Sequence, residues 1–149
     1  MISPSAKATI ELAQKFAKSL KGGEIIGLIG ELGSGKTVFV KGLAKGLGIK
    51  EIITSPTFVI LKEYDILRPK IHLRGVSKGL RKFVHVDAYR VESIGDIISA
   101  GIEDFLGRKD VIIVIEWAEK IKEILPKSTI YINFKYKDKN KREISIISA

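Results

Sequence analysis

The chain contains a run that fills every position of the pattern G-x-x-x-x-G-K-S/T, namely Gly30-Glu31-Leu32-Gly33-Ser34-Gly35-Lys36-Thr37. Glycines in such a loop let the backbone turn tightly, so that amide N–H groups point inward at phosphate oxygens. The lysine ammonium can reach the β and γ phosphates, and the threonine hydroxyl can bind Mg²⁺. The run therefore predicts a nucleotide site. The residues expected to contact the nucleotide are Leu32, Gly33, Ser34, Gly35, Lys36, Thr37 and Val38.

The flanks of this loop predict a strand before it and a helix after it. Residues 24–29 are a nearly continuous apolar run, typical of a strand buried on both faces. Residues 36–47 are expected to form a helix that Gly48 ends. A phosphate bound in the loop would face the positive end of that helix.

Helix and strand patterns alternate along the chain, which predicts an α/β fold. Ser3-Pro4 indicates a helix start, with Ser3 as the N-cap and an amphipathic helix over residues 4–20. We expect further helices at 94–106 and 117–124, and strands at 57–64, 82–86, 111–116, 128–136 and 143–148. The expected architecture is a P-loop NTPase-like mixed sheet flanked by helices, in a single domain over residues 1–149.

Two predicted strands end in an acidic residue, Asp87 and Glu116. A phosphate loop needs such an acid for its metal at the end of a neighbouring strand. We expect Glu116, on the more apolar and hence more central strand, to bind the metal with Thr37. Asp87 would then orient or deprotonate the attacking water. The two roles could be exchanged, and either acid alone could instead cap a loop.

A hydroxyl-rich segment, Thr54-Ser55-Pro56-Thr57, precedes the 57–64 strand. Such a segment can sense a γ-phosphate as a switch. On composition alone an ordinary turn is the better explanation, because Ser and Pro favour turns.

The chain is basic, with 26 Lys and Arg against 17 Asp and Glu and a formal net charge of +9. Residues 65–82 are rich in Lys and Arg and show no clear period, so we expect a basic loop or hairpin excursion there. A second basic cluster lies at 135–142. This excess favours a polyanionic partner, and a lysine-rich solvated surface is the alternative explanation.

Composition also excludes several classes of site. The absence of Cys excludes disulfides and thiolate metal sites, and two histidines cannot form a histidine-rich metal cage. The longest aliphatic run, residues 111–115, is far shorter than the ~20 residues that span a bilayer. The first residues lack the features of a signal peptide. We therefore expect a cytoplasmic protein without a membrane segment.

Four blocks in a fixed order make the chain similar to a known family. They are residues 30–37, Ser55-Pro56-Thr57-Phe58, His85-Val86-Asp87-Ala88-Tyr89-Arg90 and Glu116-Trp117. The chain resembles the bacterial TsaE family, small ATPases of tRNA threonylcarbamoyladenosine synthesis, over nearly its whole length. The resemblance implies that ATP and Mg²⁺ are bound, and that hydrolysis is weak alone and stimulated in a complex with TsaD and TsaB.

The resemblance also implies roles for individual residues. Lys36, Asp87 and Glu116 would be catalytic, Thr37 and Glu116 would hold Mg²⁺, and Thr57 would face the γ-phosphate. Trp117 matches a family aromatic beside the site, although a sole Trp in a small domain is more often a core residue. The neighbouring Tyr89 and Arg90 could be structural or partner-facing.

The chain departs from the family pattern at four positions. Glu31 stands in place of Asp, Ser34 in place of Ala, Val38 in place of Thr and Ala118 in place of Pro. No phosphate or metal ligand is lost, although the missing hydroxyl at Val38 can alter contacts to the α-phosphate. The 65–81 stretch is longer and more basic than the resemblance implies.

Two other functions are compatible with the loop. A small-molecule or nucleotide kinase would need an arginine-bearing lid, which Arg74 or Arg81 could supply. A nucleotide-dependent RNA-binding module would need aromatics beside the basic clusters, and only Tyr64, Phe83, Phe134 and Tyr136 border them. We expect instead that basic residues 68–82 contact tRNA within the complex. The adenine contact is left open, with the first helix around residues 7–9 as one candidate.

Overall fold

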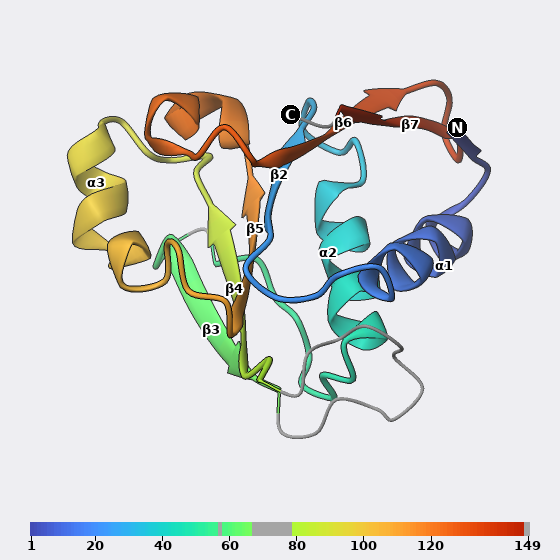
Figure 1. The fold of residues 1–149 in the computed structure, drawn as a ribbon. Helices are drawn as coiled ribbons and strands as arrows, with labels where there is room; N and C mark the ends of the chain where they lie inside the picture. The colour runs from blue at the N-terminus through green and yellow to red at the C-terminus, as the bar shows by residue number, and fades with distance from the viewer. Residues whose placement is uncertain (57, 67–78, 148–149) are drawn as a thin grey trace.

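The computed structural model describes residues 1–56, 58–66 and 79–147 and shows one mixed seven-stranded sheet with helices on both faces (Figure 1). The strand order is β1-β7-β6-β2-β5-β4-β3. The strands are β1 (Ile2–Ser3), β2 (Ile25–Ile29), β3 (Leu61–Asp65), β4 (Lys82–Asp87), β5 (Val111–Glu116), β6 (Ile130–Tyr136) and β7 (Arg142–Ile147). The α-helices are α1 (Ala6–Ala17), α2 (Lys36–Gly46) and α3 (Ile94–Ser99), and the 3₁₀ helices are η1 (Ile102–Asp104) and η2 (Ala118–Ile124).

The centre of the sheet is parallel and its margins are antiparallel. Strand β2 runs parallel to β5 and β6, and β4 runs parallel to β5. At the margins, β3 pairs with β4, β7 pairs with β6 and β1 pairs with β7, all antiparallel. Because the carboxyl ends of β2, β5 and β4 meet at one edge, the residues that follow these three strands are brought together. The predicted fold class, a mixed α/β sheet flanked by helices, is confirmed.

Two hydrophobic layers hold the helices to the sheet. Helices α1 and α2 pack on one face through residues such as Phe39, Leu43 and Phe83. Helices α3, η1 and η2 cover the other face, where Ile97 and Ile113 are buried. Strand β5 is buried at all six positions because both of its faces are covered, which explains its unbroken apolar run.

Helices α1 and α2 approach each other at two glycines of α2. A Cβ built on Gly42 would lie 2.5 Å from the Cβ of Ala13 and 2.7 Å from the carbonyl oxygen of Ile10. A Cβ on Gly46 would lie 2.6 Å from the Cβ of Ala17. The small side chains therefore set the distance between the two helices, and through it the position of the helix that follows the loop.

Replacing Gly42 by Ala is expected to lower the free energy of unfolding by about 1–3 kcal/mol, because the added methyl group overpacks the α1–α2 contact. Gly95→Ala in α3 is the matched control, since its Cβ would meet only Ser93 Oγ, at an ordinary 3.5 Å. Urea denaturation followed by circular dichroism measures both. A Gly42 variant as stable as the parent chain would contradict this account of the packing.

The N-terminal helix starts later than the sequence predicts. Its N-cap is Ser5, whose Oγ accepts from the amide of Ala8, and not Ser3. Ser3 lies in β1, opposite Arg142, and its Oγ is 2.7 Å from Thr9 Oγ1. The prediction was wrong because β1 depends on pairing with β7, which is distant in the sequence.

Three other predicted elements have different bounds. The strand expected at 57–64 begins at Leu61, because residues 58–60 form a turn in which Ile60 has a φ of 66°. The helix expected at 94–106 is divided into α3 and η1 by Gly101, which has a φ of 96°. The helix expected at 117–124 is η2, a 3₁₀ helix with a kink at Ile121. Across the described residues, no helix has the length and hydropathy needed to cross a membrane.

Candidate functional site

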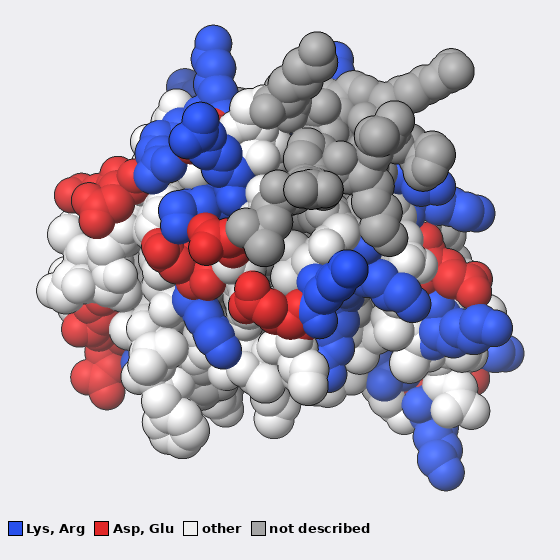
Figure 2. Space-filling model, turned by 90° about the horizontal axis from the view of Figure 1, so that it is seen from below, with Lys and Arg blue, Asp and Glu red and all other residues white. Residues whose placement is uncertain are grey.

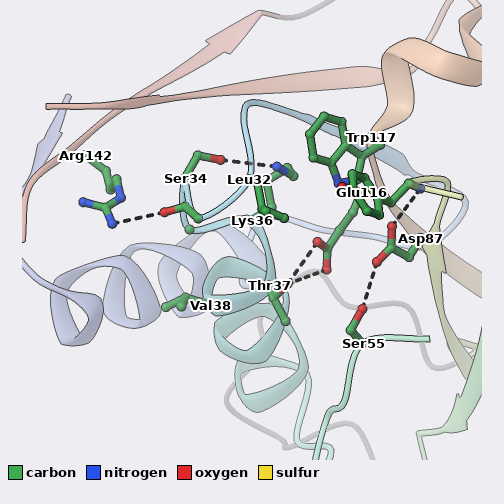
Figure 3. Close-up of a pocket in the computed structure, with 13 residues that line it drawn as sticks. Leu32, Ser34, Lys36, Thr37, Val38, Ser55, Asp87, Glu116, Trp117 and Arg142 are labelled. Atoms are coloured by element: carbon green, nitrogen blue, oxygen red, sulfur yellow. Dashed lines mark hydrogen bonds between the residues drawn. The ribbon is translucent and has the colours of Figure 1, made fainter. Parts of the chain in front are cut away.

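The loop that follows β2 forms the floor of a cavity at the carboxyl edge of the sheet (Figure 3). Gly35 is the N-cap of α2 and has a φ of 101°, a left-handed conformation that favours glycine. Gly30 lies so close to β6 that a Cβ there would be 2.6 Å from the carbonyl oxygen of Phe134. The cavity measures about 380 Å³. Its walls are Leu32, Gly33, Ser34, Gly35, Lys36, Thr37, Val38, Ser55, Asp87, Tyr89, Glu116, Trp117 and Arg142.

The structure therefore brings together every site residue that the sequence predicts except Thr57, which lies outside the described residues. Glu116 ends β5, the neighbour of β2, and Asp87 ends β4, the neighbour of β5. The two acids are directly opposite each other in the register of these strands. The expectation that a central strand places its terminal carboxylate beside the loop agrees with this topology.

The Lys36 ammonium is buried under the loop. It donates to the carbonyl oxygens of Gly30 and Glu31, at 2.5 and 2.8 Å, and lies 4.1 Å from the centre of the Trp117 ring. Burial lowers the pKa of Lys36, and the negative charges of Glu116, Glu119 and Asp87 oppose that shift. The cation is thus held at the loop by carbonyl groups and an aromatic face.

Glu116 is nearly fully buried and accepts several hydrogen bonds. Thr37 Oγ1 is 3.0 Å from each of its two carboxylate oxygens, as the dashed lines of Figure 3 show. The ring of His85 brings Nε2 to 2.8 Å from Oε1 of the same carboxylate. A hydroxyl from the start of α2 and a carboxylate from the end of β5 are therefore in direct contact.

Asp87 is linked to the segment at 54–56 by a hydrogen bond. Ser55 Oγ donates to Oδ2 of Asp87 at 2.8 Å, and the amide of Tyr89 donates to Oδ1 at 3.0 Å. The Asp87 amide in turn donates to the carbonyl of Ile60, at the end of the turn that precedes β3. Ser55 of the hydroxyl-rich segment is thus part of the cavity wall.

Trp117 lies in the cavity wall, half-buried, and is not a residue of the central core. Its φ of 58° is a left-handed conformation that a bulky side chain rarely adopts. That conformation places the ring over Lys36, with the Tyr89 ring 5.0 Å away between centroids. Strain of this kind is typical of functional sites.

Sequence reasoning missed two residues of the site, Arg142 and the role of His85. Arg142 begins β7, and its Nη2 donates to the carbonyl of Gly33 at 3.1 Å. The sequence offered only its place in the second basic cluster, because the contact depends on the position of β7 in the sheet. His85 belongs to one of the four blocks, but no sequence pattern indicates its contact with Glu116.

The predicted basic surface at 68–82 is described only in part, since residues 67–78 lie outside the described residues. Lys82 is within 3.1 Å of both Glu63 and Asp65, and hydrogen bonds to these two carboxylates raise the pKa of Lys82. Figure 2 shows positive and negative side chains intermixed on this lower edge of the molecule. The charge of Lys82 is therefore already paired within the chain.

Known proteins resemble this chain over nearly its whole length. Residues 3–144 match the family described as "Threonylcarbamoyl adenosine biosynthesis protein TsaE". A tRNA threonylcarbamoyladenosine biosynthesis protein TsaE from Bacillus subtilis is 37% identical over 143 residues, which are 96% of this chain and 79% of the relative. The chain belongs to the TsaE family.

Further TsaE proteins match over nearly their full lengths. The protein from Treponema pallidum is 36% identical over 97% of both chains, and that from Aquifex aeolicus is 36% identical over 98% of this chain and 93% of its own. The crystal structure of YdiB from Bacillus subtilis superposes with a TM-score of 0.73 at 31% identity, covering 99% of this chain and 83% of YdiB. The likeness to the TsaE family thus extends from sequence to fold.

Proposed function

We propose that this chain binds ATP with Mg²⁺ and hydrolyses it, as the ATPase of tRNA threonylcarbamoyladenosine synthesis, within a cytoplasmic complex that contains TsaD and TsaB. The observation that carries this proposal is the contact of Thr37 with Glu116 beside the phosphate loop, at 3.0 Å to both carboxylate oxygens. A turn without a ligand has no need for a buried carboxylate at this place. The names of the relatives supply the pathway.

The loop and Lys36 are assigned to the phosphates. The loop amides and the N-terminal end of α2 favour negative charge in the cavity. Lys36 would exchange its contacts with the loop carbonyls for the β and γ phosphate oxygens, and its charge would stabilise the negative charge that develops during hydrolysis. The contact with Trp117 favours the cation and limits its movement.

The residues present fit a magnesium ion. Thr37 and Glu116 supply a hydroxyl and a carboxylate, the hard oxygen ligands that Mg²⁺ prefers. The described residues contain no cluster of three or more acidic or histidine side chains suited to a metal, which agrees with an ion held largely by phosphate and water. When bound, the ion would neutralise charge on the phosphates.

Asp87 is assigned to the attacking water. It lines the same cavity as Lys36, and Ser55 and the Tyr89 amide fix its two oxygens. A carboxylate held in this way can accept a proton or a hydrogen bond from water in a set direction. Thr57 lies outside the described residues and is assigned to the γ-phosphate by the family resemblance alone.

The adenosine is assigned to a second hollow of about 130 Å³ that adjoins the main cavity. The two share Gly35, Val38 and Arg142. Ser5, Ala6 and Thr9 of the first helix region also line the hollow. The hollow includes Thr9, one of the first-helix residues that the sequence indicates as candidates for the adenine contact.

The described residues do not favour the two other functions. Arg81 precedes β4, and its amide bonds to the carbonyl of Asp110, before β5. Both lie at the edge opposite the loop, so Arg81 cannot close over the phosphates of a kinase. Arg74, the other arginine expected for a lid, lies outside the described residues. Of the four aromatics beside the basic clusters, Tyr64, Phe83 and Phe134 are buried and cannot stack on RNA bases. Tyr136 is 58% exposed, and one exposed ring does not form the series of stacking aromatics that single-strand readers present.

Phosphate release from ATP and Mg²⁺ tests the proposal, measured first with this protein alone and then with TsaB and TsaD added. We expect slow release alone and a rise of at least about tenfold with both partners, since conformational and partner steps commonly set such rates. Equal rates with and without the partners would contradict the proposed complex. A labelled phosphoryl group recovered on an added acceptor, in place of free phosphate, would indicate a kinase.

A further inference from the structure

One buried histidine, His85, has no role in the mechanism proposed above. It lies on β4 opposite Val114 of β5, two residues before the Asp87–Glu116 pair. Because side chains alternate along a strand, His85 shares a face with Asp87, and Val114 shares that face with Glu116. His85 is 0% exposed. Its ring reaches diagonally across the two strands to the carboxylate at the end of β5.

The polar contacts of the ring converge on a single carboxylate. Nε2 is 2.8 Å from Oε1 of Glu116, and because an ionised carboxylate only accepts, we assign the proton to Nε2. Nδ1 has no hydrogen-bond partner among the residues that the structure describes. A buried nitrogen without a partner costs free energy that an apolar side chain would not. Packing alone therefore does not account for a histidine at this position.

Thr37, the second donor to Glu116, does not by itself determine the orientation of the Glu116 carboxylate. Thr37 Oγ1 is equally distant, at 3.0 Å, from Oε1 and Oε2. The terminal torsion of a glutamate is broad and roughly two-fold, so one equidistant hydroxyl does not select a single setting. His85 contacts Oε1 alone and makes the two oxygens different. Oε1 accepts from both His85 and Thr37, whereas Oε2 is close to Thr37 alone. Oε2 therefore has more lone-pair capacity left for a metal ion.

We propose that His85 is the positioning residue of the metal site, whose Nε2–H fixes the carboxylate of Glu116 in the orientation that receives the ion. The proposal rests on the assignment of Thr37 and Glu116 to Mg²⁺. A histidine of this kind acts through Glu116 and has no contact with the nucleotide. Partners of metal ligands commonly change metal affinity by about 10–100-fold when they are removed.

Binding of Mn²⁺ to the ADP-loaded protein tests the proposal without turnover, by the electron paramagnetic resonance signal of free Mn²⁺. His85→Leu removes the donor and is expected to raise the Kd for Mn²⁺ by about 10–100-fold. His85→Gln places an amide N–H near the position of Nε2 and is expected to restore most of the affinity. His85→Asn has a similar polarity but is too short, so we expect it to behave as the Leu variant. Affinity for ADP without metal should change less than about twofold in all three variants.

Val114→Ala is the matched control, because it opens space beside His85 in the same strand pair but removes no donor. It is expected to lower the melting temperature and to leave the Kd for Mn²⁺ within about twofold. Folded Leu or Asn variants that bind Mn²⁺ as the parent does would overturn the role of His85. A Gln variant that binds Mn²⁺ as weakly as the Asn variant would also overturn the role of His85. This comparison remains valid even if the Leu variant does not fold. A parent protein that binds no Mn²⁺ with ADP would instead overturn the proposed function.

Discussion

Lys36→Ala is expected to lower the rate of ATP hydrolysis, measured with partners present, by at least about 100-fold. The loop holds this ammonium through the carbonyls of Gly30 and Glu31, and the face of Trp117 lies beside it. Removing one preorganised donor from a transition state typically costs a factor of about 10²–10³. The alanine side chain has no charge with which to stabilise the transferring phosphoryl group. Steady-state phosphate release measures the loss.

Lys41→Ala is the matched control for this variant. Lys41 is on the same helix, α2, but it is exposed and does not line the cavity beside the loop. We expect its hydrolysis rate to stay within about twofold of the parent rate. If Lys36→Ala retained the parent rate while remaining folded, the assignment of the loop to the phosphates would be wrong.

The sequence predicted the parts of the site that depend on local pattern. The loop, the strand before it and the helix after it follow from glycine spacing and an apolar run, and all three are found. The placement of Asp87 and Glu116 near the loop was predicted because each ends an apolar strand, whereas the pairing of their two strands is a finding of the structure. The resemblance of four blocks to the TsaE family indicates that these parts belong to one site.

The residues that sequence reasoning missed depend on contacts between distant segments. Arg142 reaches Gly33 across 109 positions of the chain, because the order β7-β6-β2 brings the start of β7 close to the loop. The N-cap was assigned to Ser3 in place of Ser5 because the pairing of β1 with β7 has no local signature. Trp117 has a positive φ that no residue-type preference predicts. Each of these features is set by tertiary structure.

Asp87→Asn is expected to lower kcat by about 10²–10⁴-fold, the usual range for loss of a general base, while Mn²⁺·ADP still binds. The substitution preserves the local structure, because an Asn oxygen can still accept from the Tyr89 amide and its NH₂ group can donate to Ser55. What is lost is the negative charge and the ability to take a proton from water. Single-turnover phosphate release, together with the Kd for Mn²⁺ in the ADP complex, separates these effects.

Two comparisons make this prediction specific. Glu119→Gln removes another negative charge that acts on Lys36, but Glu119 does not line the cavity, so we expect a change in kcat of less than about threefold. For Glu116→Gln we expect the main effect on the Kd for Mn²⁺, whereas for Asp87→Asn we expect it on kcat. The reason is that the Glu116 carboxylate is the one held by Thr37 and His85. If instead the Asp87 variant lost Mn²⁺ and the Glu116 variant kept it, the two acids would exchange roles. In that case the contact of Ser55 with Asp87 would mark the metal side of the cavity, and the 54–56 segment would act on the ion and not on the water.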